Sequence, residues 1–161
     1  MTLIEILAGV QSGAPVAGAL AQRAEIMGLS QASHDAVLRP RDPGGLSHAQ
    51  RAALAARMAL WNADAALAAH YRALLAQAGE SPALSAVAAG ESPTVEPRFA
   101  AIIRHADLLT KRTRDACKED IRALAAAGVA EPDIVRLAEL AAFVNYQARV
   151  IAGLRLLGAA T

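Results

Sequence analysis

The chain carries a row of alanines at helical spacing that ends in a histidine. The row consists of Ala52, Ala56, Ala59, Ala63, Ala66, His70 and Ala73. Intervals of three and four residues bring such positions onto one face of a helix. Because alanine is small, a second helix could approach this face closely, and His70 would be its single titratable group. The row therefore predicts a helix that packs tightly against another.

The rest of the sequence favours helices as well. Hydrophobic residues make up 55% of the 161 positions and aromatic residues only 3%. No stretch alternates apolar and polar residues with the period of two that is typical of strands. We therefore predict an all-α fold with two long helices and about five shorter ones. It would form a single domain over residues 1–161, with N-terminal helices in 1–39, a loop in 40–46 and a core in 47–158.

Glycine, proline and capping residues set the expected helix boundaries. Ser47 and Gln50 match a capping box, and Gly79 supplies a stop, so one long helix is expected over 47–78. The other expected helices cover 2–10, 16–27, 31–38, 118–127 and 132–157, with one more starting at Pro97 and a helical turn after Pro82.

Charge and composition exclude several classes of function. The net charge of +1 and the absence of a basic cluster with aromatics argue against nucleic-acid binding. No uncharged apolar run is long enough to span a membrane, and the N-terminus lacks the features of a secretory signal, so a cytoplasmic protein is expected. The four histidines show no zinc-like spacing and no glycine-rich phosphate loop is present, so we expect no metal and no cofactor.

Two stretches of the chain resemble a known family. The first runs from Leu46 through Trp61-Asn62-Ala63-Asp64 to His70. The second runs from Leu109 through Gly128 to Asn145-Tyr146-Gln147-Ala148-Arg149. Together they are similar to the carboxymuconolactone decarboxylase / alkylhydroperoxidase-D superfamily, in its peroxidase-related branch. The resemblance implies an all-α fold and a bacterial protein of antioxidant-defence type that forms trimers or hexamers.

The resemblance also implies an active site, which this chain keeps only in part. Active members use a Cys-x-x-Cys pair, a histidine four residues later and a glutamate one helix-length earlier. His70 matches the histidine, whereas Ala63 and Ala66 occupy the cysteine positions and Arg51 the glutamate position. A methyl group neither ionises nor forms a disulfide, so thiol peroxidase chemistry at these positions is not expected.

Three functions remain open on the sequence. The first is a peroxidase-like member of the superfamily without its thiol centre. The second is a non-catalytic structural or binding subunit, and the third is an acid–base enzyme that uses His70. A pocket would lie between the 47–78 and 132–157 helices and hold a small anionic ligand. Its expected lining is Arg51, Trp61, Asp64, Tyr71, Asn145 and Arg149. A homo-oligomer (dimer, trimer or hexamer) is expected.

The candidate residues each have a second interpretation. His70 is either a general acid/base or a hydrogen-bonded core histidine, and Arg51 would keep it neutral at pH 7 if the two are close. Arg149 is either a clamp for a bound carboxylate or the partner of an acidic side chain. Cys117 would start a helix, where its thiol pKa would be lowered, or is simply a poor replacement for a capping hydroxyl.

The remaining histidines and a short basic run receive structural interpretations. His34, His48 and His105 are expected at surface turns or helix starts. Lys111, Arg112 and Arg114 would complement the negative end of a helix.

Overall fold

The computed structural model describes residues 1–159, which form nine α-helices and one 3-10 turn, without a strand. The all-α expectation is confirmed, with more helices than predicted. The helices are α1 (Leu3–Ala8), α2 (Pro15–Ala21), α3 (Ala24–Leu38), α4 (His48–Trp61), α5 (Ala65–Ala78), α6 (Pro82–Ala88), α7 (Pro97–Lys111), α8 (Lys118–Ala126) and α9 (Glu131–Ala159), and the 3-10 turn spans Thr113–Asp115.

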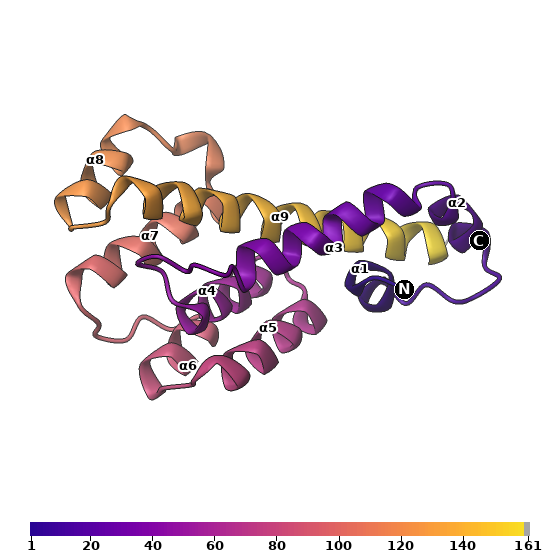
Figure 1. Cartoon of the computed structure of the whole chain (residues 1–161), viewed down its shortest axis with the longest axis horizontal. Coiled ribbons are helices and arrows are strands. Elements are labelled where there is room, and N and C mark those ends of the chain that lie inside the picture. The colour runs from indigo at the N-terminus through magenta and orange to yellow at the C-terminus, as the bar shows by residue number, and fades with distance from the viewer. Residues whose placement is uncertain (160–161) are drawn as a thin grey trace.

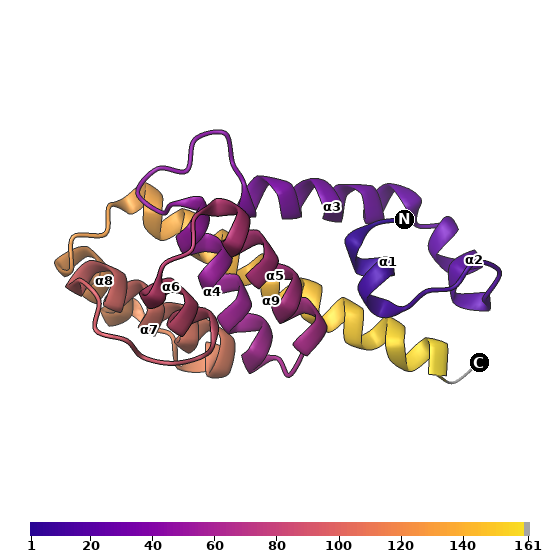
Figure 2. The same cartoon turned by 90° about the horizontal axis from the view of Figure 1, so that it is seen from below.

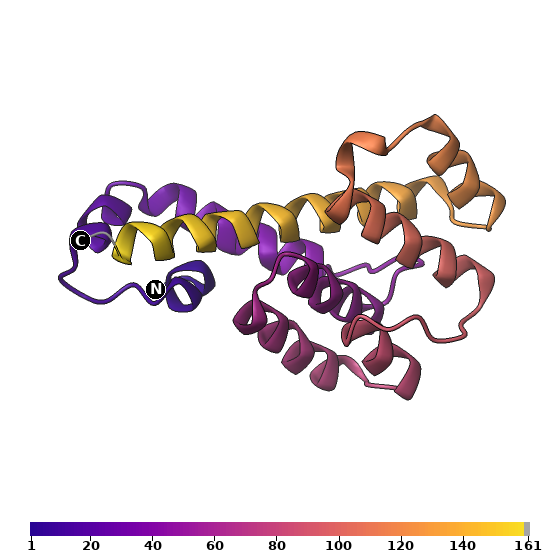
Figure 3. The same ribbon diagram turned by 180° about the vertical axis from the view of Figure 1, so that it is seen from behind.

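The 29-residue helix α9 runs along the length of the molecule (Figure 1). Helices α1, α2 and α3 pack against it, with α1 and α2 near its C-terminal end (Figures 1 and 3). Helices α4 to α8 gather at the other end. None of the helices within residues 1–159 combines the length and apolar character needed to cross a lipid bilayer.

Helix α4 is the buried centre of this fold. Ten of its 14 residues are buried, and it packs against α5, α6, α7 and α9. Its alanines Ala52, Ala53, Ala55, Ala56 and Ala59 are at most 2% exposed. Small side chains on every side of one helix allow several neighbouring helices to approach it closely. The first part of the alanine row, which lies in α4, predicts this close packing.

The segment 47–78 is a pair of helices, which corrects the single long helix predicted for it. Helix α4 ends at Trp61, and Asn62 is its C-cap. Ala63 adopts a left-handed φ of 57°, and the Asp64 side chain then accepts the backbone N–H of Leu67 at 3.0 Å as the N-cap of α5. Asn and Asp side chains compete with helical hydrogen bonds and favour such caps. The chain therefore turns back here, and α5 lies beside α4 (Figure 2).

The turn divides the alanine row. Ala52, Ala56 and Ala59 lie buried in α4, whereas Ala66 and Ala73 are exposed on α5. The predicted continuous packing face therefore does not exist beyond α4.

The N-terminal boundaries also differ from the prediction. The break between helices lies at Gln22 and Arg23, and α3 continues through Gly28. One glycine costs a helix only about 1 kcal/mol. This cost is offset because Met27, Ser30, His34 and Leu38, spaced by three and four residues, form one buried face. Three other features agree with the prediction. They are the helix α6 after Pro82, the start of α7 at Pro97 and the end of α8 before Gly128.

Asp64 joins three parts of the fold, which gives a test of its role. Beside capping α5, its carboxylate accepts two bonds from the Arg155 guanidinium in α9, at 2.9 and 3.2 Å, and Arg155 also donates to the Leu7 carbonyl of α1. Asp64→Ala should lower the free energy of unfolding by about 2–3 kcal/mol, because it removes the cap and leaves a guanidinium without its carboxylate. Asp64→Asn, which can still cap the helix, should cost less.

Chemical denaturation measures both changes. Asp42→Ala is the matched control, since the Asp42 carboxylate is exposed, lies 3.8 Å from Arg136 and accepts a surface hydrogen bond from the Gly44 N–H at 3.0 Å. Its effect should stay within about 0.5 kcal/mol. Equal losses for the Asp42 and Asp64 variants would contradict the central role of Asp64.

Candidate functional site

Two histidines and an aspartate form a continuous line where α3 meets α5. Nε2 of His34 in α3 lies 3.2 Å from Nε2 of His70 in α5. Nδ1 of His34 lies 2.9 Å from Oδ1 of Asp35. His34 is 2% exposed, which corrects its predicted position on a surface turn. The arrangement links a carboxylate to two imidazoles in series.

The acceptor at the end of this line determines where its protons lie. The hydrogen bond from His34 outweighs desolvation and lowers the pKa of Asp35, so Asp35 is a carboxylate that accepts Nδ1–H of His34. In the neutral pair, Nε2 of His34 is then an acceptor and Nε2–H of His70 donates to it. This leaves the lone pair of His70 on Nδ1.

Nδ1 of His70 is available to a ligand. This nitrogen has no hydrogen-bond partner among residues 1–159. Every fully buried side-chain nitrogen and oxygen in that range does have a partner, so Nδ1 of His70 is in contact with solvent. His70 can therefore accept a proton from outside while His34 and Asp35 hold its other side.

Aromatic side chains hold the histidine pair in place. The His34 ring stacks on Tyr71 with centroids 6.1 Å apart and meets the edge of Phe143 at 6.1 Å. The Tyr71 hydroxyl donates to Oε1 of Gln147 in α9. Because burial also raises the pKa of Tyr71, this residue is a fixed wall of the site and not a proton donor at neutral pH.

The environment of His70 keeps it neutral. Burial lowers the pKa of His70 from 6.5 to about 4, and the positive charge of Arg39 acts in the same direction. The neutral state at pH 7 agrees with the sequence-based expectation. The arginine responsible is Arg39 at the end of α3, however, and not Arg51.

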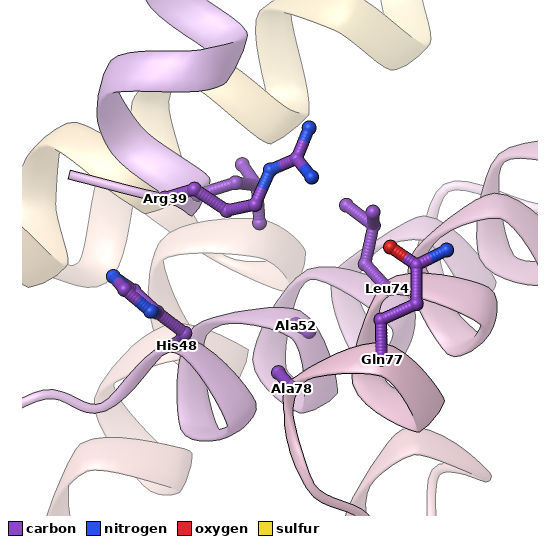
Figure 4. Close-up of a pocket in the computed structure, with 7 residues that line it drawn as sticks. Arg39, His48, Ala52, Leu74, Gln77 and Ala78 are labelled. Carbon is purple, nitrogen blue, oxygen red and sulfur yellow. The ribbon is translucent and has the colours of Figure 1, made fainter.

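A surface cavity of about 260 Å³ lies between α3, α4 and α5, and neither His34 nor His70 lines it. Its lining includes Leu38 and Leu74, which follow His34 and His70 by four residues, so the cavity begins one helical turn beyond the pair. Figure 4 shows Arg39 and His48 on one side, Leu74 and Gln77 on the other, and the methyl groups of Ala52 and Ala78 below them. The cavity thus combines an apolar floor with an exposed guanidinium.

Arg51 has a structural position away from the histidines. The residue is 2% exposed, and its guanidinium donates to the carbonyls of Leu46, Val37 and Pro43 at 2.8, 2.9 and 3.0 Å. All three carbonyls belong to the segment from the end of α3 to the start of α4. Arg51 therefore holds this loop against α4.

Asn145 and Arg149 line a cavity of about 380 Å³ with Leu109, Thr113 and three alanines of α9. The Asn145 amide is engaged by Asn62, Thr110 and the Ala141 carbonyl. Arg149 is exposed, so its guanidinium does not require a buried acidic partner. Two carboxylates that could have paired with Arg149 bind other arginines, Asp64 with Arg155 and Asp107 with Arg57.

Trp61 belongs to a polar junction between α4 and α7. Its Nε1–H donates to Asp107 at 2.8 Å, and Nζ of Lys111 lies 3.3 Å from the ring centroid. Asp107 also accepts two bonds from the buried Arg57, at 2.7 and 2.8 Å. Trp61 therefore belongs to a hydrogen-bonded network with Asp107 and Arg57. The residues predicted to line one common pocket lie in several separate networks.

Cys117 is the N-cap of α8 and is exposed. Its backbone N–H donates to Asp120 at 2.8 Å and its Sγ lies 3.3 Å from the same oxygen. The backbone N–H of Glu119 favours the thiolate, but the hydrogen bonds to the Asp120 and Glu119 carboxylates oppose it and raise the thiol pKa. The predicted low pKa is therefore wrong, because neighbouring carboxylates outweigh the helix terminus.

The sequence did not reveal several of the buried polar residues. His34, Gln147, Arg57 and Asp133 are all at most 6% exposed. The pattern that could have found His34 is the spacing of Met27, Ser30, His34 and Leu38, which places it on the core face of α3. The pairing of His34 with His70 joins residues 36 positions apart, and no local pattern contains it.

Comparison with known proteins gives one clear structural likeness. No family model matches the chain, and no curated protein matches it. The structure is similar to the crystal structure of an uncharacterized peroxidase-related protein from Silicibacter sp. TM1040. The TM-score is 0.70 at 17% sequence identity, over 81% of this chain and 68% of that chain. The two proteins share a fold. At this identity the likeness extends to the fold alone.

The depressed pKa of His70 predicts how stability depends on pH. Between pH 6.5 and about 4 the unfolded chain binds the proton and the folded chain does not, so stability should be complete above pH 6.5 and fall as the pH approaches 4. The loss should be on the order of 2 kcal/mol, allowing for solvent screening of a partly exposed ring. His70→Gln should remove this part of the pH dependence in urea denaturation between pH 7 and 4. An unchanged slope would contradict the assignment.

The environment of Cys117 predicts an unreactive thiol. With a dithiol reductant, the wild-type protein and Cys117→Ser should both fail to turn over hydrogen peroxide, because the alanines at 63 and 66 carry no thiol and the raised pKa of Cys117 disfavours its thiolate. The measurement is peroxide consumption by the pure protein. Turnover that disappears in Cys117→Ser would show that the reactive thiol lies at the start of α8.

Proposed function

We propose that this chain is a thiol-free member of the carboxymuconolactone decarboxylase / alkylhydroperoxidase-D superfamily that performs acid–base chemistry with His70. The shared fold with a peroxidase-related protein supports the family assignment, together with the helix–glycine–helix stretch that ends in Asn145, Tyr146 and Arg149. The position of His70 on α5, four residues after Ala66, supports it further.

The observation that carries the proposal is the line from Asp35 through His34 to His70. A core histidine that serves only packing needs one hydrogen-bond partner. Here the partner is a second imidazole, which is itself bonded to a carboxylate. Such a series orients the His70 ring and fixes which of its nitrogens carries the lone pair that can take up a proton.

The proposed reaction is removal of a proton from carbon next to a carbonyl group. His70 Nδ1 takes the proton, the electron pair of the C–H bond moves toward the carbonyl oxygen, and the proton is later returned to the same or a neighbouring carbon. His70 is unprotonated at pH 7, as a base must be, because its pKa lies near 4. The low pKa also limits its strength as a base, so this role requires a substrate whose proton is already acidic.

The position of Arg39 favours a substrate that carries a negative charge. Its guanidinium is exposed at the cavity beyond the pair, and its charge acts on the titration of His70, so the two residues share one electrostatic environment. A carboxylate bound by Arg39 would neutralise that charge and raise the pKa of His70, which would make the base stronger when substrate is present.

Proton exchange tests the proposal with a panel of simple carbonyl compounds. The pure protein in D₂O is mixed with small oxo acids and carboxylated lactones, and loss of the carbon-bound proton signal is followed by NMR. His70→Asn should slow exchange by about 100-fold, within the range found for positioned general bases. Arg39→Gln should mainly weaken substrate binding, which raises KM more than it lowers kcat.

His48→Asn is the control in this experiment. His48 lies at the same cavity, but its Nε2 is bonded to the Pro40 carbonyl at 2.9 Å and it is outside the histidine line. Equal exchange rates in the wild type and His70→Asn would contradict the proposal. The non-catalytic subunit would then be the better function.

That second function has an observation of its own. Ile26, Leu29 and Tyr146 are 44%, 57% and 41% exposed and line a largely apolar groove of about 460 Å³ between α3 and α9. Exposed apolar surface of this kind is typical of protein interfaces. The homo-oligomer stays a prediction, which light scattering after size-exclusion chromatography measures directly.

A further inference from the structure

His105 in α7 is a buried histidine whose ring has no hydrogen-bond partner in the described part of the chain. It is 7% exposed, which corrects its predicted place at the surface. No hydrogen bond joins its ring to any other group within residues 1–159. Since no buried side-chain nitrogen or oxygen in that range is left without a partner, the ring nitrogens of His105 must reach solvent.

The solvent that His105 reaches lies in a cavity of about 220 Å³ between α7 and α8. The walls of the cavity are Ala101, Leu108, Ala123 and Leu124, and its polar groups are Arg104, His105, Arg112 and Asp120. It is separate from the Asp35–His34–His70 line and shares no residue with the cavity of Figure 4. The proposed acid–base function does not use it.

The polar groups leave an excess of positive charge. Two guanidinium groups face one carboxylate, and that carboxylate already accepts the backbone N–H and the thiol of Cys117. Arg104 is exposed and takes part in no ion pair or hydrogen bond in the described part of the chain. Arg112 has a weak surface ion pair with Asp115 at 3.7 Å, and its charge also acts on Asp120. Both guanidinium groups therefore keep most of their donor capacity for a ligand.

We propose that this cavity binds a phosphate group, with Arg104 and Arg112 as charged donors and His105 as the buried donor. Two planar guanidinium groups and an imidazole offer several N–H donors, which suits the several oxygens of a phosphate better than the two oxygens of a carboxylate. The group is carried either by inorganic phosphate or by a phosphate monoester. The cavity volume is several times the roughly 30 Å³ that one water occupies, so it leaves room for an organic part beside the phosphate.

Phosphate binding would change the protonation of His105. In the empty cavity, burial lowers the pKa of this ring, although the Asp120 carboxylate opposes the shift. A bound dianion beside the ring favours the imidazolium, so the pKa should rise on binding. The charged groups that share the cavity with this ring are the guanidinium groups of Arg104 and Arg112 and the carboxylate of Asp120.

The experiment is an NMR titration of the full chain that follows the ring protons of its four histidines. The probes are inorganic phosphate, phenyl phosphate and acetate at constant ionic strength. The signals of His105, assigned through His105→Gln, should move saturably with both phosphates, and the pKa of His105 should rise in the saturated protein. Tighter binding of phenyl phosphate would identify a monoester site, and equal binding an inorganic phosphate site.

Two arginine variants test the cavity itself. Arg104→Gln should weaken phosphate binding by about tenfold or more, since each charge-assisted bond to an anion contributes strongly. Arg122→Gln is the matched control, because it removes the same charge from α8 while its side chain pairs with Glu119 at 3.1 Å and does not line the cavity.

Three results would overturn the proposal. They are His105 signals that do not respond to phosphate, acetate that binds as tightly as phosphate, and equal weakening by Arg104→Gln and Arg122→Gln. Phosphate binding is read at His105, whereas the proposed acid–base function is read from proton exchange that depends on His70, so failure of this site is distinguishable from failure of that function.

Discussion

The turn at Asn62–Asp64 is the constraint on which the rest of the structure depends. Without it, the alanine-rich segment would extend as one rod away from α3. With it, α5 folds back beside α4, and His70 meets His34 of α3 at 3.2 Å. The Asp64 carboxylate that caps α5 also holds Arg155, and through it α9 and the end of α1. One short polar side chain therefore determines the direction of a helix and the position of the histidine site.

Much of the fold follows from local sequence patterns, and the particular failures have physical causes. Proline and glycine place the limits of α6, α7 and α8, because these residues act on their own backbone whatever surrounds them. The turn inside 47–78 escapes prediction because alanine and leucine on both sides favour a helix, and Asn62 and Asp64 are equally compatible with polar positions on its surface. The continuity of α3 through Gly28 escapes it because tertiary burial outweighs a weak local penalty.

Of the residues that form the candidate site, only His70 could be predicted from the sequence. His70 is singled out by its position on the helix, but its partner His34 lies in a segment that carries no signal of chemistry. The ion pairs of the arginines could not be predicted either, because the sequence does not indicate which carboxylate each guanidinium binds. Arg57 and Arg155 take Asp107 and Asp64, which leaves Arg149 exposed. Buried polar side chains need partners, and the choice among partners is decided by packing over long sequence separations.

The loop between α3 and α4 has a consequence for the histidine line that no contact within the line reveals. His34 and His70 lie on separate segments, so the frequency with which their rings meet depends on an effective concentration that the connecting chain sets. Arg51 ties that connection to α4 at three carbonyls, and Asp133 adds a fourth point through the Gly45 N–H at 2.9 Å. The loop is therefore a short, rigid connection. Because it is already ordered, the entropic cost of bringing the rings of His34 and His70 together is small before any ligand binds.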